Sequence, residues 1–159
     1  MQLVNDVLDL SRLEANMMKF QIQEYDAVAL CNDAIYMARM RNEETIEIYF
    51  DTHIETQPIT TDTGRLIQAL VSTLTYPQKN TAHREITFTL TRDDSGKQIC
   101  FRISNSPLAD PEFNSQEVSI RHDINRLLLQ HFGGSYNITA DEQERPVINF
   151  TYPLDIISE

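Results

Sequence analysis

Glycine, cysteine and basic residues are scarce in this sequence, and the shortages of cysteine and of basic residues each exclude a class of site. The chain holds 4 glycines and 2 cysteines in 159 residues. Two cysteines provide neither a disulfide framework nor a metal-binding spacing, so we expect Cys31 and Cys100 to be buried, reduced thiols. Against 24 acidic residues stand 13 basic ones, which gives a formal net charge of -11. This charge argues against binding to nucleic acid or to an anionic membrane, because phosphate groups favour clustered Lys and Arg.

A long apolar run and a targeting signal are also missing. No stretch of 18 apolar residues occurs, and a membrane-spanning helix needs about that many. The N-terminal segment has no basic region and carries Asp6, Asp9 and Glu14, so it is not a signal peptide. We expect these three acids on the solvated face of a helix. We also expect a cytoplasmic location and no membrane contact for this part of the protein, while an anchor further upstream stays open.

The first helix is predicted over residues 2–17. Leu3, Val7, Leu10 and Met17 follow steps of four and three residues, the pattern of a coiled-coil helix. No capping residue precedes the pattern, so we expect further sequence upstream. We expect the methionines around the first two helices to fill the space between them: Met17, Met18, Met37 and Met40.

Strands and helices alternate along the remaining sequence. Alternation of apolar and polar residues predicts strands at 18–25, 45–51, 57–61, 85–93, 98–104, 135–139 and 147–153. Apolar residues at helical spacing predict helices at 27–41, from 62 or 63 to about 75, and at 119–132, with caps at Asp26, at Asp62 or Thr63, and at Ser119. The order predicts an α+β fold, a two-layer α/β sandwich. Its mixed, mostly antiparallel sheet is covered by helices on one face.

Three stretches, in this order, resemble the C-terminal half of a two-component sensor histidine kinase. "LVNDVLDLSRLEAN" is similar to the end of the second helix of that family's dimerisation and phosphotransfer hairpin. "TTDTGRLIQALVSTL" resembles the start of the nucleotide-binding helix, and "INRLLLQHFGGSYNI" resembles the last helix of the ATP-binding domain with the following strand. The resemblance implies the end of the hairpin at 1–17 and a GHKL-type ATP-binding domain at 18–159.

The resemblance also implies an activity and partners. The family is an ATP-dependent protein-histidine kinase that uses Mg²⁺, forms a homodimer through the helical hairpin and works with the receiver domain of a response regulator. Its phosphoacceptor histidine lies on the first hairpin helix, which this chain lacks. None of the four histidines is followed by the family's acidic residue, basic residue and proline: His53, His83, His122 and His131. We therefore expect no autophosphorylation by this chain alone, and we assign no catalytic and no metal-binding residue.

The predicted nucleotide site departs from the family on its first helix. Aligning "RLIQALVSTLTYPQKNT" by its Arg, Gln and Lys places Tyr76 where the family has an Asn that helps to hold Mg²⁺. Ser72 takes the place of a second Asn, and Lys79 matches the family's basic residue. Pro77 lacks an N–H group and costs about 3 kcal/mol inside a helix. We therefore expect the helix to stop near Thr75.

The other parts of the predicted site depart from the family as well. Asn105 and Pro107 replace the Asp and Gly that receive the adenine. The lid, 106–118, has no glycine and carries acids that would repel a triphosphate: Asp110, Glu112 and Glu117. The glycine-rich start of the last helix corresponds to Ser119 to His122, whose side chains would crowd a phosphate. Arg121 in this stretch either binds a phosphate itself or is a solvated residue of the first turn.

These substitutions leave two main hypotheses. In the first, the chain is a degenerate ATP-binding domain that binds ATP and Mg²⁺ weakly or not at all and acts as a regulatory module. In the second, it is a divergent but working kinase domain that binds ATP through Asn105, Lys79 and Arg121 and phosphorylates a histidine on the missing upstream helix. A third possibility is that the pocket is filled by the chain's own side chains, Tyr76 foremost.

Overall fold

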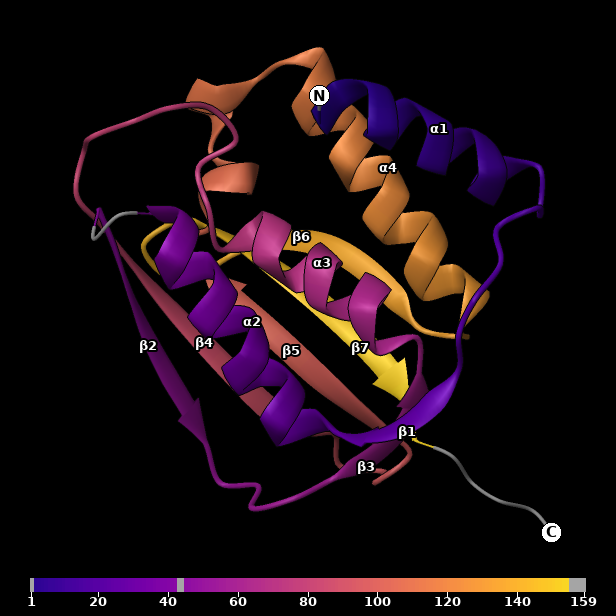
Figure 1. Ribbon diagram of the computed structural model, residues 1–159. Helices are drawn as coiled ribbons and strands as arrows, with labels where there is room; N and C mark the ends of the chain where they lie inside the picture. Colours follow the sequence, from indigo (N-terminus) through magenta and orange to yellow (C-terminus); the bar gives the residue numbers. More distant parts are fainter. Residues whose placement is uncertain (1, 43–44, 155–159) are drawn as a thin grey trace, which may run out of the picture.

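The computed structural model describes residues 2–42 and 45–154 (Figure 1). Its helices are α1 (Gln2–Glu14), α2 (Ala27–Asn42), α3 (Thr63–Thr73) and α4 (Gln116–His131). Its strands are β1 (Gln23–Asp26), β2 (Ile46–Thr52), β3 (Pro58–Thr61), β4 (Arg84–Arg92), β5 (Gln98–Ser104), β6 (Ser135–Ala140) and β7 (Pro146–Pro153). Between β5 and α4 lie two single 3₁₀ turns, η1 (Pro107–Ala109) and η2 (Pro111–Phe113).

The main sheet is mixed, with the strand order β2-β4-β5-β7-β6. β2 and β4 run parallel, whereas the other neighbours run antiparallel. β1 and β3 form a separate antiparallel pair. The helices lie over one face of the main sheet, with α2 beside α3 and α1 alongside α4 (Figure 1). This architecture confirms the predicted two-layer α+β fold with a mostly antiparallel sheet.

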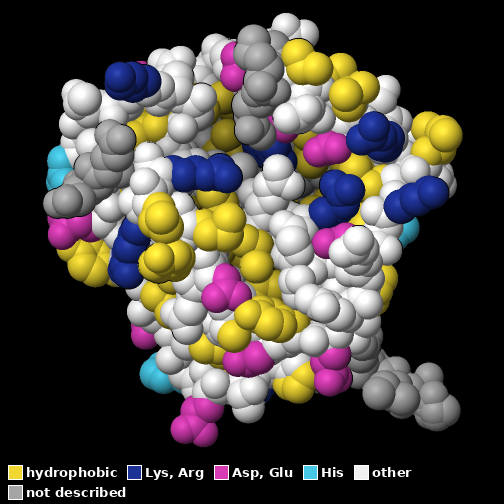
Figure 2. All heavy atoms as spheres, in the orientation of Figure 1, with side chains coloured by type: hydrophobic (Ala, Val, Ile, Leu, Met, Phe, Trp, Pro, Cys, Tyr) yellow, Lys and Arg dark blue, Asp and Glu magenta, His cyan; other side chains and the backbone are white. Residues whose placement is uncertain are grey.

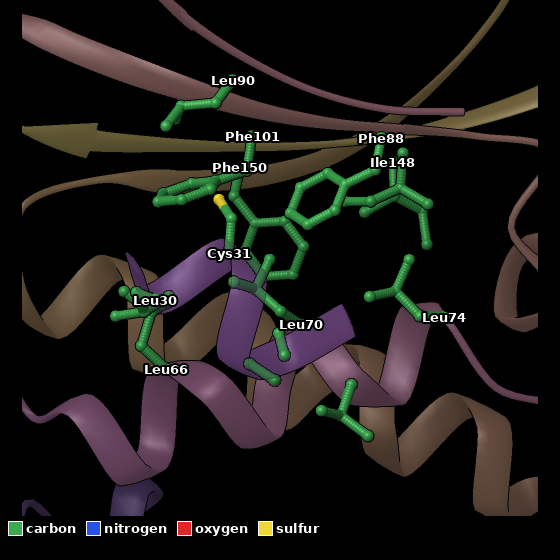
Figure 3. Close-up of a cluster of buried hydrophobic side chains, with 14 of the residues drawn as sticks. Leu30, Cys31, Leu66, Leu70, Leu74, Phe88, Leu90, Phe101, Ile148 and Phe150 are labelled. Carbon is green, nitrogen blue, oxygen red and sulfur yellow. The ribbon is translucent and has the colours of Figure 1, made fainter. Parts of the chain in front are cut away.

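The core lies between the main sheet and the helices. Side chains of a strand alternate between its two faces, so Ile86, Phe88 and Leu90 of β4 all point to the helices and are fully buried. Figure 3 shows leucines of α2 and α3 facing the aromatic rings of the sheet. Cys31 is a buried free thiol in this cluster, as expected, whereas Cys100 lies on the opposite face of β5 and is partly exposed.

The predicted helix starts are confirmed at two of the caps and wrong at the third. The Asp26 and Asp62 carboxylates accept hydrogen bonds from N–H groups in the first turns of α2 and α3. α4 begins one turn earlier than predicted, because the hydroxyl of Ser115 accepts from the N–H of Val118 at 3.3 Å and caps the helix. Ser119 therefore lies inside α4, where its side chain is exposed.

α1 packs along α4 and not along α2. The expectation that the methionines fill the space between the first two helices is therefore wrong: Met17 and Met40 are 71% and 66% exposed. The expectation of a solvated Asp6 is wrong as well, because this residue is 4% exposed. Within the described residues, no helix is long and apolar enough to cross a membrane.

Candidate functional site

A cavity of about 400 Å³ opens in the helical layer. One wall comes from α1 and the start of α4, and the other comes from the end of α2, from α3 and from the following segment, residues 74–81. It corresponds to the recess in the upper half of Figure 2. The structure brings Ser72, Tyr76, Lys79 and Arg121 of the predicted site together around this cavity, but not Asn105 and Ser119.

The end of α3 forms the cavity's inner edge. α3 ends at Thr73, close to the predicted stop and before Pro77. The Ser72 hydroxyl donates to the carbonyl of Ala69 at 2.5 Å and accepts from the side-chain amide of Asn125 in α4 at 3.2 Å. Ser72 thus joins α3 to α4, and its hydroxyl is already engaged by two protein groups.

Tyr76 lines the cavity, and neighbouring groups hold its side chain in place. Its hydroxyl donates to the carbonyl of Ala82 at 2.8 Å. Its ring meets that of Phe113 edge-on, with 5.6 Å between the centroids, and the guanidinium of Arg84 lies 5.7 Å from its centroid. Mg²⁺ prefers hard oxygen ligands in a tight octahedron, and a neutral phenol fixed in this way fits that role poorly.

The lid between β5 and α4 is folded into the protein. The Ser106 hydroxyl is buried and donates to the carbonyl of Thr73 at 2.6 Å, which fixes the start of the lid on α3. Leu108 in η1 and Phe113 in η2 are 3% and 5% exposed and belong to the main hydrophobic core. Burying a side chain of this size is worth about 1.5–3 kcal/mol. Opening the lid therefore has a substantial cost.

Arg84, the first residue of β4, fastens the lid to the sheet. Its Nη1 donates to the backbone carbonyl and to Oδ1 of Asn105, at 3.0 and 3.1 Å, and its Nη2 forms an ion pair with Asp110. The amide nitrogen of Asn105 donates in turn to the carbonyl of Glu85 at 2.9 Å. Asn105 is thereby held on β4 and away from the cavity.

Arg121 is neither solvated nor directed at an open phosphate site. Its Nη2 lies 2.5 Å from Oδ1 of Asp6 in α1, and the two side chains are 9% and 6% exposed. The ion pair joins the second turns of α1 and α4, and both residues line the cavity. The Asp6 carboxylate compensates the charge of this guanidinium, which weakens its attraction for an anion.

His122 links α4 to the lid and to β6. Its Nδ1 lies 2.7 Å from the hydroxyl of Tyr136, and its Nε2 lies 3.1 Å from the carbonyl of Leu108. Burial lowers the pKa of His122 and raises that of Tyr136 to about 12. The neutral imidazole satisfies both contacts when Nε2–H donates to Leu108 and Nδ1 accepts from Tyr136.

The remaining charges around the cavity are mixed. Arg41 and Lys79 lie on the wall formed by α2 and the segment 74–81, and Glu117 lies on the α4 wall. Beside them, the lid is closed by its own apolar side chains, and the start of α4 carries the paired Arg121. No glycine is among the described residues that line the cavity, so it offers no glycine-lined cradle for phosphate groups.

Sequence reasoning missed Asp6 and Arg84 as site residues. Asp6 shares one side of α1 with Leu10 and Leu13, at spacings of four and seven, and this helical spacing could have indicated a buried carboxylate. For Arg84 no local signal exists, because its partners in the lid follow it by 21 and 26 residues.

Solved sensor histidine kinases share this fold. The histidine kinase AdeS of Acinetobacter baumannii matches with a TM-score of 0.69 and 13% identity, over 96% of this chain and 77% of the solved AdeS chain. A nucleotide-free catalytic domain of the histidine kinase ThkA matches with a TM-score of 0.68 and 16% identity, over 85% of this chain and 99% of that domain. Full-length ShkA in complex with AMPPNP matches with a TM-score of 0.69 and 20% identity, over 99% of this chain but only 36% of ShkA.

No protein-family model matches the sequence, and neither does a curated protein. At identities of 13–20% the structural likeness establishes the fold and not the activity. The chain therefore has the fold of the ATP-binding catalytic domain of sensor histidine kinases.

Proposed function

We propose that this chain is a histidine-kinase-type ATP-binding domain that has lost nucleotide binding and serves as a regulatory module in two-component signalling. In this proposal residues 1–17 end a dimerisation hairpin, and residues 18–159 form the degenerate domain. The intact protein is a cytoplasmic or membrane-anchored homodimer that works with a response-regulator receiver domain.

The state of Arg121 is the observation that carries this proposal. The family resemblance places a glycine at this position, where bare N–H groups of the helix start receive phosphate. In this chain α4 already begins at Gln116, so residue 121 lies inside the helix, where the long side chain of Arg121 forms a buried ion pair with Asp6 of α1. Releasing this pair to admit a triphosphate would leave Asp6 buried without its guanidinium partner, at a cost of about 3–5 kcal/mol.

Two further features support the proposed partners. Val4, Val7 and Leu8 of α1 are 55%, 46% and 48% exposed, so a second apolar side of this helix remains for a dimer partner. ThkA, which has the same fold at 14% identity, has been solved in complex with the response regulator protein TrrA; this chain spans 48% of that ThkA chain.

The contacts around α4 give the module a route for conformational change. A shift of α1 moves Asp6 and therefore Arg121 at the start of α4. The neighbouring His122 holds the carbonyl of Leu108, so the same motion pulls on the lid. In this proposal the conformation of the closed lid depends on the position of α1. A working kinase instead uses its lid to hold ATP.

Calorimetric titration of the chain with ATP and Mg²⁺ tests the loss of nucleotide binding. We expect no heat of binding and no thermal shift at millimolar nucleotide. A dissociation constant in the micromolar range would overturn the proposal. Incubation with labelled ATP should likewise give no phosphohistidine.

A divergent ATP-binding kinase domain is the second candidate, and one observation favours it. Ser72, Lys79 and Arg121 line the same cavity, as a retained phosphate site requires. If this candidate is right, ATP binds measurably, and Lys79→Ala weakens binding at least tenfold while Lys97→Ala, in the turn before β5, does not. Absence of binding to the unaltered chain rejects it.

A further inference from the structure

Two carboxylates and an imidazole meet on the face of the sheet that the helices do not cover. Glu47 of β2 and Glu85 of β4 are partners in the parallel register, so their side chains stand next to each other. His83 comes immediately before β4, and its Nε2 lies 3.2 Å from Oε1 of Glu47 and 3.7 Å from Oε2 of Glu85. The three side chains are 52–60% exposed and open to solvent.

The two glutamates need a positive partner. Like charges side by side on neighbouring strands are destabilising. Within the described residues, no Lys or Arg forms an ion pair with either carboxylate, and His83 is the only basic group that does. The hydroxyl of Tyr49 donates to Oε1 of Glu47 at 3.4 Å but adds no positive charge.

The separations match those between ligands of one metal ion. One ligand atom from each of the three side chains lies within 4.8 Å of the other two. Nitrogen and oxygen ligands bind Zn²⁺ at about 2.1 Å, and two ligands of a tetrahedral ion are then about 3.4 Å apart. The distances of 3.2 and 3.7 Å from His83 to the two glutamates bracket this value. Small side-chain rotations in exposed residues are enough to complete the geometry.

The donor set selects the class of metal. An imidazole nitrogen is a poor ligand for Mg²⁺ and Ca²⁺, which prefer oxygen, but a good one for Zn²⁺ and similar transition metals. We propose that Glu47, His83 and Glu85 form a binding site for a divalent transition-metal ion such as Zn²⁺, with the fourth position open to water. This site is separate from the cavity, so it stands whether or not the chain binds ATP.

Metal binding here would act on the wall of the cavity. His83 follows Ala82, whose carbonyl accepts the hydrogen bond of the Tyr76 hydroxyl. His83 contacts Glu47 of β2 and Glu85 of β4 through its side chain, so an ion bound to these three residues would fix the end of the segment 76–82 to both strands. Zinc should therefore slow amide exchange in this segment.

Calorimetric titration of the whole chain with ZnCl₂ at pH 7.5, in a buffer free of phosphate and chelators, tests the site. We expect one Zn²⁺ per chain with a micromolar dissociation constant, and no binding of Mg²⁺ or Ca²⁺ at the same concentrations. His83→Ala and the double variant Glu47→Gln, Glu85→Gln should each weaken zinc binding at least tenfold. His53→Ala is the matched control, because this histidine is also exposed but lies beyond the opposite end of β2, and it should change nothing.

A second readout keeps the test independent of folding defects. Hydrogen exchange of residues 76–82 should slow on adding zinc to the unaltered chain and to His53→Ala, but not to His83→Ala. Far-UV circular dichroism of each variant checks that it is folded. Zinc affinity in the millimolar range, or equal zinc affinity in His83→Ala and the unaltered chain, would overturn the proposal.

Discussion

Replacing Arg121 with Ala tests how α1 is held on the domain. Two unit charges about 4 Å apart attract by about 4 kcal/mol at an effective dielectric constant of about 20, and the desolvation of both charges offsets most of that gain. Arg121→Ala keeps the desolvation cost of the Asp6 carboxylate but loses its attraction to the guanidinium, because Asp6 remains in a site where its side chain is 6% exposed. Such losses are about 3–5 kcal/mol. We expect about 3 kcal/mol, because α1 can detach from α4 and return Asp6 to water.

Urea unfolding followed by circular dichroism measures this loss, and hydrogen exchange of the α1 amides shows whether the helix detaches. Asp6→Ala should cost less, because the long Arg121 side chain already lines the cavity and can turn towards solvent. Arg126→Ala is the matched control: its ion pair with Asp123 is 43% and 53% exposed, and exposed pairs contribute less than about 1 kcal/mol. Equal losses in Arg121→Ala and Arg126→Ala, with unchanged exchange in α1, would refute the reasoning.

Three further variants test other parts of the structure. Because burial lowers the pKa of His122, its neutral form is favoured in the folded protein; the stability it contributes is complete above the unfolded-state pKa of about 6.5 and declines as pH falls below it. Between pH 7.5 and 5.5 the melting temperature of the unaltered chain should therefore fall further than that of His122→Gln, and parallel pH profiles would contradict this. A Cβ on Gly134 would lie 2.0 Å from the carbonyl oxygen of Thr151, so Gly134→Ala should cost about 3 kcal/mol in urea unfolding, whereas Gly64→Ala, with its nearest contact at 3.7 Å, should cost nothing. Tyr76→Phe should cost about 1 kcal/mol through its lost hydrogen bond, and an unchanged midpoint would show that this bond does not hold the segment.

The sheet could be predicted from sequence because its signal is local. In β4, Ile86, Phe88 and Leu90 alternate with threonines, and burial follows the same alternation. The cap at Asp26 was predicted directly, and the cap at Asp62 was one of two alternatives with Thr63. The start of α4 was not predicted correctly, because Ser115 and Ser119 are both suitable caps one turn apart. The hydroxyl of Ser115 accepts from the N–H of Val118, three residues later. This contact depends on the path of the preceding lid, which the sequence alone does not give.

The partner of α1 could not be predicted, because this helix has apolar residues on more than one side. The stripe identified from the sequence includes Val7, which is 46% exposed and does not face α4. The side that does pack on α4 includes Asp6, whose spacing to Leu10 and Leu13 could indicate burial but not the partner of its carboxylate. Its partner Arg121 lies 115 residues away, so neither residue carries a local sign of the pair.

The lack of glycine in the lid predicts one property of the lid but not its path. A lid without glycine cannot easily bring bare N–H groups around a phosphate, and that much follows from composition. Where the lid goes instead depends on Leu108 and Phe113, whose apolar side chains gain most by joining the core under Tyr76. Three of the lid's anchors are polar groups on α3, β4 and α4: the Thr73 carbonyl, Arg84 and His122. In the proposed function, the residues that take the place of the nucleotide-site motifs also provide contacts that close the lid, so loss of ATP binding and a fixed lid are expected together.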